Sequence, residues 1–491
     1  MNEKQDTDQA QAEPEEQPLA PPEVLQQTQH TIVIDGQAIA YTATAGTLVL
    51  KAEPDRPKAI FFFVAYTRDD VEDITQRPIT FAFNGGPGSS SVWLHLGVLG
   101  PRRVEMADAE GAAPRPPGRL VDNASSLLDV TDLVFIDPVS TGYSRAAPGE
   151  EAKQFHGIEP DIEWVGEFIR LYATRFQRWG SPKFLAGESY GTTRAAGLAG
   201  HLQTRHGMYL NGIMLISSIL SFQTANFDPG NDLPYILFLP TYTATAWYHG
   251  RLEAELQVDL RRTLNEVEAF ARGPYTLALM QGDALPADER VEIGAQLARY
   301  TGLSPAYIER TNLRINIFRF VKELLREQRL SVGRLDARFT GPDRDAAGER
   351  FDFDPSYAVI QGCYTAMLNH YVRAELEFES DLPYEALNSL YKEWDYSKYQ
   401  NRYVNVAETL RGALCQNPHL KVFVANGYYD LATPYFATEY TINHLGIEPA
   451  LRENISLAYY ESGHMMYVHQ PSLAQLKADL AAFIRDALAD G

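Results

Sequence analysis

Short apolar runs separated by turns occupy much of the chain, and this pattern predicts β-strands. Most of the runs are rich in β-branched and aromatic residues and are bounded by Gly, Pro, Asn or Asp, as is typical of strands buried in a parallel sheet. The predicted core strands are residues 79–83, 133–136, 183–186, 212–216, 421–425 and 455–460. Four earlier runs predict an antiparallel start with a hairpin turn at Asp35-Gly36, namely residues 31–34, 37–44, 47–52 and 59–66.

The pattern changes between residues 221 and 405, where apolar positions recur at the spacing of a helix. Because strands resume after this segment, the sequence predicts an α/β protein with one mixed, mostly parallel sheet flanked by helices. A large, mainly helical lid is expected between two of the later strands. The expected domains are a core of residues 30–220 and 406–491, a lid of residues 221–405 and a disordered, acidic tail of residues 1–29.

Composition and charge narrow the classes of protein that this fold can represent. The longest unbroken apolar run, residues 59–66, is far shorter than the roughly 20 residues of a membrane-spanning helix, so no membrane partner is expected. The formal net charge of −21 opposes binding to a phosphate backbone, which argues against a nucleic-acid partner. Cys363 and Cys415 are too few for a four-thiolate zinc site, and two buried free thiols are favoured over a bridge between them.

The first residues of the chain bear on the cellular compartment of the protein. It shows neither the basic start nor the apolar core of a secretory signal, so the expected location of the chain as written is the cytoplasm. A periplasmic or secreted location stays open if the sequence begins after a processed leader. The sequence also leaves a homodimer open.

The segment Gly187-Glu-Ser-Tyr-Gly191 lies between a predicted strand and a predicted helix. A Gly-x-Ser-x-Gly pattern in this position indicates a nucleophile elbow, a tight turn that lifts the serine hydroxyl above the sheet. The turn needs glycine at both ends because larger side chains would collide with the neighbouring strand and helix. We therefore predict Ser189 as a nucleophile.

A serine hydroxyl needs a base and an acid that orients the base, and in this fold they follow the serine in the order Asp, His. Asp430 and His464 each follow a late predicted strand. His464 is the predicted general base, and Asp430 is predicted to fix its tautomer. His469 lies beyond the strand-end turn, and Asp137 precedes the serine in the chain, so both are weaker candidates.

Acyl transfer also needs hydrogen-bond donors for the developing oxyanion. The first core strand runs into Asn84-Gly-Gly-Pro-Gly-Ser-Ser-Ser91, where glycines allow a close backbone approach to a ligand. We predict the backbone N–H groups of Gly86 and Tyr190 as the oxyanion hole. A phosphate-binding loop is disfavoured because the segment lacks the Gly-Lys-Ser/Thr ending.

Five ordered blocks resemble the signatures of the serine carboxypeptidase family. They are Asn84-Gly-Gly-Pro-Gly-Ser-Ser90, residues 135–144, Gly187-Glu-Ser-Tyr-Gly191, Gly427-Tyr-Tyr-Asp430 and Gly463-His-Met465. The resemblance implies an α/β-hydrolase fold and an enzyme that removes C-terminal residues from peptides through an acyl-enzyme, with no metal and no organic cofactor. It also implies the same triad and oxyanion donors.

The resemblance further implies a site for the carboxylate of the substrate, formed by Asn84, Gly85 and Glu188. The family has a Trp and a second Glu at positions that here hold Ala82 and Val98. In the family the two glutamates share a proton, so Glu188 is expected to lack its partner. We hypothesise weaker or differently pH-dependent exopeptidase activity, or carboxylate recognition by one of three nearby residues, which are His95, Arg102 and Arg103.

Two other functions stay open. An esterase, amidase or acyltransferase acting on small acyl substrates could use the same triad with relaxed carboxylate recognition. A catalytically silent binding protein on the same fold is disfavoured because all three triad residues are present. Aromatic stretches at residues 235–242 and 247–249 either line an apolar substrate pocket or form the core of the lid.

Overall fold

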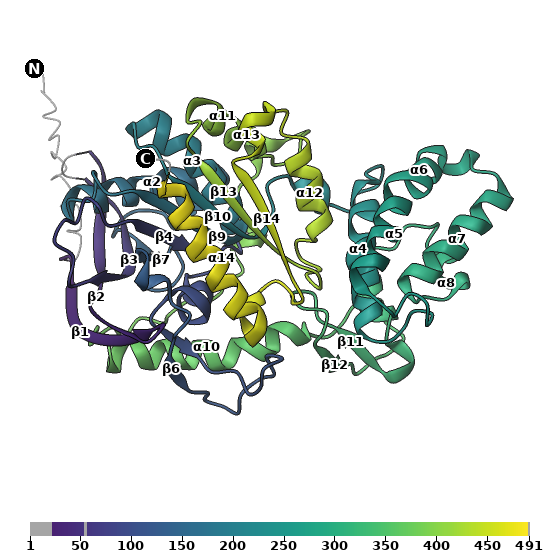
Figure 1. Ribbon diagram of the computed structural model, residues 1–491, viewed down its shortest axis with the longest axis horizontal. Helices are drawn as coiled ribbons and strands as arrows, with labels where there is room; N and C mark the ends of the chain where they lie inside the picture. The colour runs from purple at the N-terminus through teal and green to yellow at the C-terminus, as the bar shows by residue number, and fades with distance from the viewer. Residues whose placement is uncertain (1–21, 54–55, 490–491) are drawn as a thin grey trace, which may run out of the picture.

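A mixed β-sheet runs through the middle of the molecule (Figure 1). The computed structural model describes residues 22–53 and 56–489, and within them this sheet has ten strands. Their spatial order is β1-β2-β3-β7-β4-β9-β10-β13-β14, and β8 pairs with β3. The strands of the sheet are β1 (Leu25–Ile34), β2 (Gln37–Glu53), β3 (Arg56–Arg68), β4 (Ile79–Phe83), β7 (Asp132–Ile136), β8 (Arg145–Ala146), β9 (Lys183–Ser189), β10 (Gly212–Ser218), β13 (Lys421–Gly427) and β14 (Ile455–Tyr460).

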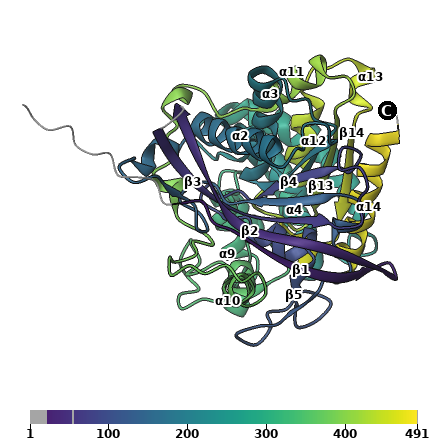
Figure 2. The same cartoon turned by 90° about the vertical axis from the view of Figure 1, so that its left-hand side faces the viewer.

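The sheet is antiparallel at its start and parallel from β7 to β14. This confirms the predicted mixed, mostly parallel sheet, and the order is that of an α/β-hydrolase. The predicted hairpin turn also forms, since Ile34 pairs with Gln37 across Asp35 and Gly36. Figure 2 shows β1 and β2 as long strands on the outer side of the sheet.

Two boundaries near the start of the chain differ from the expected ones. The first strand begins at Leu25, so the expected tail boundary at residue 29 is wrong, and residues 1–21 lie outside the described residues. Residues 37–44 and 47–52, which were expected as separate strands, form the single strand β2. Gly46 stays within the sheet and pairs with Phe63. A Cβ at Gly46 would lie 2.3 Å from the Val24 carbonyl oxygen, so this glycine permits a close strand contact and does not mark a turn.

Helices cover both faces of the sheet. The helices within the described residues are α1 (Val92–Leu94), α2 (Ile158–Arg175), α3 (Tyr190–His206), α4 (Leu233–Tyr248), α5 (Leu260–Phe270), α6 (Thr276–Gln281), α7 (Ala287–Thr301), α8 (Pro305–Arg310), α9 (Ile317–Glu323), α10 (Pro355–Ala374), α11 (Ala407–Gln416), α12 (Tyr435–Asn443), α13 (Pro449–Arg452) and α14 (Gln470–Ala489). On one face α2, α3 and α11 pack against the strands, and on the other α1, α10 and α14 do so. The side chains of β3 alternate between these two clusters, with Phe61 and Phe63 in one and Phe62 and Val64 in the other. This alternation explains the unbroken apolar run in the sequence.

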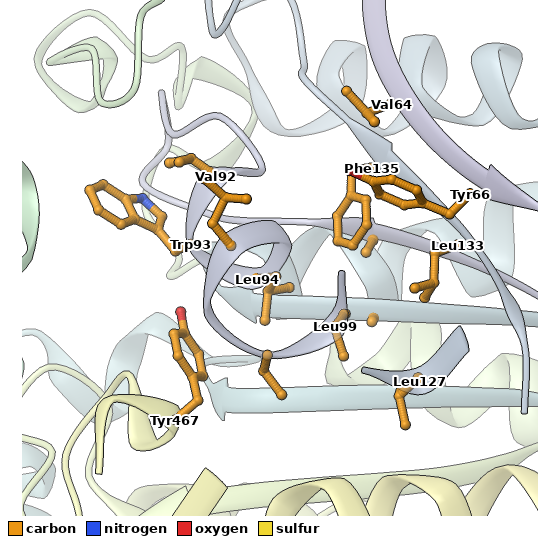
Figure 3. Packing of buried hydrophobic residues seen from close by; sticks show 14 of the residues in the cluster. Val64, Tyr66, Val92, Trp93, Leu94, Leu99, Leu127, Leu133, Phe135 and Tyr467 are labelled. Carbon is orange, nitrogen blue, oxygen red and sulfur yellow. The ribbon is translucent and has the colours of Figure 1, made fainter. Parts of the chain in front are cut away.

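Figure 3 shows part of the cluster on the α1 side of the sheet. A π-helical turn, η1 (His95–Leu99), continues α1, and its buried side chains face the strands. Tyr467 lies beside this turn, close to Trp93 and Leu94. The cluster therefore brings the segment before α14 next to the segment after β4.

The segment between β10 and β13 divides into two parts. Helices α4 to α8 form a lobe beside the sheet (Figure 1), and the apolar core of the lobe continues onto α12 and the loop after β13. Helix α10 instead packs its buried side chains into the cluster under the sheet, as Tyr364 and Tyr371 show. Phe238 and Tyr242 lie in the lobe core, so the structure shows the stretch of residues 235–242 as lid core, whereas Tyr248 of the second stretch is exposed.

The two cysteines differ in their surroundings. Both are free thiols; Cys363 is buried on α10, whereas Cys415 on α11 is exposed. The expectation of two buried thiols is therefore correct for Cys363 and wrong for Cys415.

Within residues 22–53 and 56–489, no helix has both the length and the apolar character needed to cross a membrane.

Candidate active site

The predicted nucleophile lies at a strained turn. Strand β9 ends at Ser189, whose backbone φ of 61° and ψ of −130° are unfavourable for a residue with a side chain, and α3 begins at the next residue. A Cβ at Gly187 would lie 2.2 Å from the Gly191 carbonyl oxygen, and a Cβ at Gly191 would lie 2.8 Å from the Phe83 carbonyl oxygen. Ser189 is half-buried although the residues on either side of it are buried. The turn therefore has the geometry of a nucleophile elbow.

The predicted acid and base are joined directly. The His464 Nδ1 atom lies 2.7 Å from Asp430 Oδ2, and both side chains are buried. Burial alone would lower the pKa of His464, but the charges of Asp430 and Glu188 outweigh burial, so the pKa is raised above its usual value. The carboxylate thus holds the imidazole with its proton on Nδ1, which leaves Nε2 free to accept a proton.

Sequence reasoning missed the groups that hold the carboxylate of Asp430. Its Oδ1 atom accepts hydrogen bonds from the backbone N–H groups of Ala432 and Thr433, at 2.8 and 3.0 Å. The Thr433 hydroxyl donates to Oδ2 at 2.7 Å. A threonine three positions after an acid is too common a pattern to have indicated this role. These donors fix the orientation of the acid and satisfy its buried charge.

The structure does not join Ser189 to His464. Within the described residues, the Ser189 hydroxyl has no hydrogen-bond partner. Hydrogen bonds of catalytic groups are often long in enzymes without substrate and shorten in the complex. The role of Ser189 with this base is therefore part of the proposal below.

The glycine-rich segment after β4 lies against the nucleophile turn. A Cβ at Gly85 would lie 2.4 Å from the backbone nitrogen of Tyr190 and 2.7 Å from that of Gly191, so only glycine fits. Gly86 has a φ of 105°, which also favours glycine. The backbone segments that carry the two predicted oxyanion donors, Gly86 and Tyr190, are therefore adjacent.

A buried ion pair supports the same segment. Arg194 Nη1 donates to the Asn84 carbonyl oxygen at 2.6 Å, and Arg194 Nε donates to Asp161 Oδ2 at 2.8 Å. Burial raises the pKa of Asp161 although the arginine opposes the shift. The sequence offered no signal for this pair because α2 supplies one partner and α3 the other.

The predicted carboxylate-binding residues also meet. Asn84 Nδ2 donates to Glu188 Oε1 at 2.9 Å, and the Leu94 backbone N–H donates to Asn84 Oδ1 at 3.0 Å. The Tyr467 hydroxyl donates to Glu188 Oε2 at 2.7 Å, so Glu188 has a second partner, but this partner is not the glutamate whose loss was expected. Burial raises the pKa of Glu188 to about 7.

Tyr467 takes the space beside the position where the family has its second glutamate. A Cβ at Gly97 would lie 2.3 Å from the Tyr467 ring, and the neighbouring Val98 is fully buried. The sequence offered no motif that joins Tyr467 to Glu188, which lies 279 positions away. A phenol has replaced a carboxyl group as the partner of Glu188.

Two of the three residues hypothesised to supply carboxylate recognition are engaged elsewhere. His95 is buried, lies 2.6 Å from the Tyr66 hydroxyl and stacks on Phe135, and burial lowers its pKa to about 3, so it is neutral. Arg102 pairs with Asp122 and Glu375. Arg103 is the third candidate for carboxylate recognition. Within the described residues, its side chain donates only one hydrogen bond, 3.4 Å long, to the Val104 carbonyl oxygen.

Asp137 and His469, the weaker candidates for the catalytic acid and base, have other hydrogen-bond partners. Asp137 Oδ1 accepts from the backbone N–H and the hydroxyl of Ser91, both at 2.8 Å, so this acid holds the glycine-rich segment. Burial raises the pKa of Asp137 to about 6. His469 Nδ1 lies 2.8 Å from the Ser472 hydroxyl at the start of α14. Among the described residues, no group of three or more His, Cys, Asp and Glu side chains is arranged to hold a metal ion.

The sheet order, the strained serine turn and the buried acid and base on later strands define the α/β-hydrolase class. The model of the family described as serine carboxypeptidase matches residues 37–474, and the chain belongs to this family.

Two curated relatives share part of the chain. A stretch of 157 residues is 32% identical to the pheromone-processing carboxypeptidase KEX1 of Saccharomyces cerevisiae strain JAY291, and it covers 30% of this chain and 20% of that protein. A stretch of 171 residues is 28% identical to the protein of the same name from Yarrowia lipolytica and covers 33% of this chain and 25% of the relative. The matches thus span only a fifth to a quarter of the length of these relatives.

A solved structure matches over most of the chain. It is the crystal structure of Kex1(Δ)p, described as a prohormone-processing carboxypeptidase from Saccharomyces cerevisiae, with a TM-score of 0.56 and 16% sequence identity. The match covers 91% of each chain. At this identity the likeness supports the fold.

Proposed function

We propose that the protein is a serine-dependent carboxypeptidase that hydrolyses the C-terminal peptide bond of its substrate through an acyl-enzyme. The observation that carries the proposal is the buried 2.7 Å contact between His464 Nδ1 and Asp430 Oδ2, in a family member with a strained serine elbow. A peptide is the favoured substrate.

The reaction follows from the geometry in two steps. The Ser189 hydroxyl attacks the carbonyl carbon while His464 Nε2 takes the hydroxyl proton, and the N–H groups of Gly86 and Tyr190 stabilise the oxyanion. His464 then donates this proton to the leaving amine, so the C–N bond breaks and an ester to Ser189 remains. Water, deprotonated by His464, cleaves the ester and restores the serine.

Recognition of the terminal carboxylate is assigned to Asn84, Gly85 and Glu188. A protonated Glu188 can donate a hydrogen bond to the substrate carboxylate, whereas an ionised Glu188 repels it. Because burial raises the pKa of Glu188 to about 7, the neutral form prevails below that pH and the charged form above it. The proposal therefore predicts a preference for free C-termini that weakens as the pH rises through about 7.

Mass spectrometry of a peptide pool tests the function. The pool contains each peptide with a free and an amidated C-terminus and is incubated from about pH 4 to about pH 8 with wild type and Ser189→Ala. Stepwise loss of C-terminal residues, faster from free than from amidated peptides at low pH and absent with Ser189→Ala, is the expected result. The ratio of free to amidated cleavage should fall with pH, while the titration of His464 affects both substrates alike. An untouched pool at every pH would overturn the proposal.

One observation favours a second candidate. Both carboxylate oxygens of Glu188 already accept hydrogen bonds, from Asn84 and Tyr467. If the glutamate remains ionised when substrate binds, the site does not select free carboxylates and suits an esterase, amidase or acyltransferase with small acyl substrates. Equal cleavage of amidated and free peptides would support this alternative.

A further inference from the structure

A loop of the inserted segment reaches the base of the triad. Residues 333–339, here named the strap, join β11 (Leu330–Val332) to β12 (Thr340–Pro342). The Gly333 backbone N–H donates to the Phe339 carbonyl oxygen at 2.8 Å, which closes the strap into a compact loop. In Figure 1 this hairpin lies at the base of the helical lobe, next to the ends of β13 and β14.

The strap holds the turn that carries His464. The His464 backbone N–H donates to the Leu335 carbonyl oxygen at 2.6 Å, and the Gly463 N–H donates to Asp336 Oδ2 at 3.0 Å. A Cβ at Gly463 would lie 2.4 Å from Asp336 Cβ, so the two backbones are in tight contact. Arg338 Nη2 donates to the Ser462 hydroxyl at 3.0 Å. Three consecutive residues of the turn are thus bonded to the strap.

The strap also holds the loop that carries Asp430. The Leu431 backbone N–H donates to the Arg334 carbonyl oxygen at 3.1 Å, and the Ala337 N–H donates to the Tyr429 carbonyl oxygen at 3.0 Å. The residues on both sides of Asp430 therefore contact the same strap as the turn of His464. One loop of the insertion therefore contacts both the loop that carries Asp430 and the turn that carries His464.

Asp336 is the side chain on which this contact depends. It is buried and bound by Arg338 through Nε at 3.0 Å and Nη2 at 2.7 Å, so its charge is paired. The Asp336 Oδ2 atom that pairs with Arg338 also accepts from Gly463. A fixed, charged acceptor of this kind orients a backbone N–H more firmly than water does.

We propose that Asp336 is a positioning residue for His464. Asp336 fixes the Gly463 backbone next to the histidine, and Arg338 orients Asp336. Its role rests on the proposed function, which makes His464 the base that serves Ser189. The insertion then helps to form the active site, and a movement of the lobe that displaces the strap would displace the base.

The test compares two buried aspartates of the insertion. Asp336→Asn weakens the acceptor for Gly463, whereas Asp343→Asn breaks the buried ion pair of Asp343 with Lys322, 2.5 Å apart. Within the described residues, the Asp343 carboxylate forms no hydrogen bond or ion pair with residues 429–433 or 462–464. We expect Asp336→Asn to lower kcat about 10- to 100-fold with KM changed less than about twofold, because small displacements of a catalytic group have effects of this size. Asp343→Asn should lower the melting temperature but leave kcat unchanged.

Two readouts separate positioning from stability. A fluorophosphonate probe measures the rate at which Ser189 is labelled, and proton NMR detects the downfield Nδ1–H resonance of His464 bonded to Asp430. Asp336→Asn should slow labelling in proportion to kcat and shift or broaden the resonance, and Asp343→Asn should change neither. Equal losses of kcat in both variants, or unchanged labelling in folded Asp336→Asn, would overturn the proposal.

A milder variant covers the case in which Asp336→Asn does not fold. Ser462→Ala removes only the hydroxyl that accepts from Arg338, and it should slow labelling about two- to fivefold, since one hydrogen bond contributes about 1 kcal/mol. Unchanged labelling would count against the strap. A wild type that is labelled at Ser189 but cleaves no peptide would overturn the carboxypeptidase function alone, and the labelling rates would still decide the role of Asp336.

Discussion

The nucleophile turn and the carboxylate pocket adjoin each other in the chain but depend on different kinds of contact. Gly187, Ser189 and Gly191 form the turn within one short segment, and their spacing alone dictates the geometry. The pocket next to it joins Glu188 to Asn84, 104 positions away, and to Tyr467, 279 positions away. A local motif therefore fixes the geometry of the serine turn, whereas contacts between distant residues fix the surroundings of Glu188.

This difference makes the two regions respond differently to change. The turn has no space for an added methyl group, and any displacement of Ser189 stops the chemistry. The pocket is a hydrogen-bond network in which the Tyr467 phenol and the Asn84 amide donate to Glu188. Substitutions in the turn should abolish activity or folding, and those in the pocket should change pH dependence and selectivity.

Removal of the reacting atom should have the largest effect. We expect Ser189→Ala to lower kcat by about 10⁴- to 10⁶-fold, as in other serine hydrolases that lose the nucleophile. The unfolding midpoint should stay unchanged or rise slightly, because the hydroxyl makes no hydrogen bond within the described residues. Steady-state kinetics and thermal unfolding of the same preparations check this. A kcat of the variant within about tenfold of the wild-type value would contradict the assignment.

Loss of space in the turn should have the next largest effect. Gly187→Ala places a Cβ 2.2 Å from the Gly191 carbonyl oxygen, and we expect a loss of about 3 kcal/mol or more in the free energy of unfolding. Gly412→Ala is the matched control, since this helical glycine has no atom within 4 Å of the added Cβ, and it should gain about 0.5 to 1 kcal/mol. Urea denaturation measures both changes. Equal stability of the two variants would show that the turn is not tight.

The difference between local motifs and contacts over long distances in the chain also explains how much of the structure the sequence could predict. The core strands, the sheet type, the elbow and the Asp430–His464 pair were all predicted, because each follows from periodicity or from a motif at a strand end. Strand β1 was placed too late because Leu25 to Gln29 lie at a sheet edge, where the strand alternates between exposed and half-buried positions and carries few apolar residues.

Many of the contacts that the sequence could not predict cross long distances along the chain, although the donors from Ala432 and Thr433 to Asp430 are local. Asp336 meets Gly463 across 127 positions, and although Gly463 belongs to the Gly-His-Met block, Asp336 belongs to no motif. Arg194 and Asp161 come from two different helices. Such pairs form only once the fold exists, because the sheet and its helices decide which faces meet.

The smallest predicted effect concerns the pocket. Tyr467→Phe removes the hydroxyl that donates to Glu188 Oε2, a hydrogen bond that favours the ionised form and so lowers the pKa of Glu188. Without it the pKa should rise further above 7, so Glu188 stays protonated to higher pH. Cleavage of free-carboxylate peptides should then persist to higher pH, with the ratio of free to amidated cleavage raised about three- to tenfold on the alkaline side.

The control for this substitution is another buried tyrosine that donates to a glutamate. Tyr300→Phe removes a 2.8 Å bond to Glu266 in the lobe, away from the site, and should leave the pH profile unchanged. The kcat/KM profiles of both variants, measured with paired free and amidated peptides, decide the matter. A profile of Tyr467→Phe that moves to lower pH would mean that the phenol stabilises the protonated carboxyl group, and that the pocket keeps the proton-sharing arrangement of the family with a tyrosine as its second member.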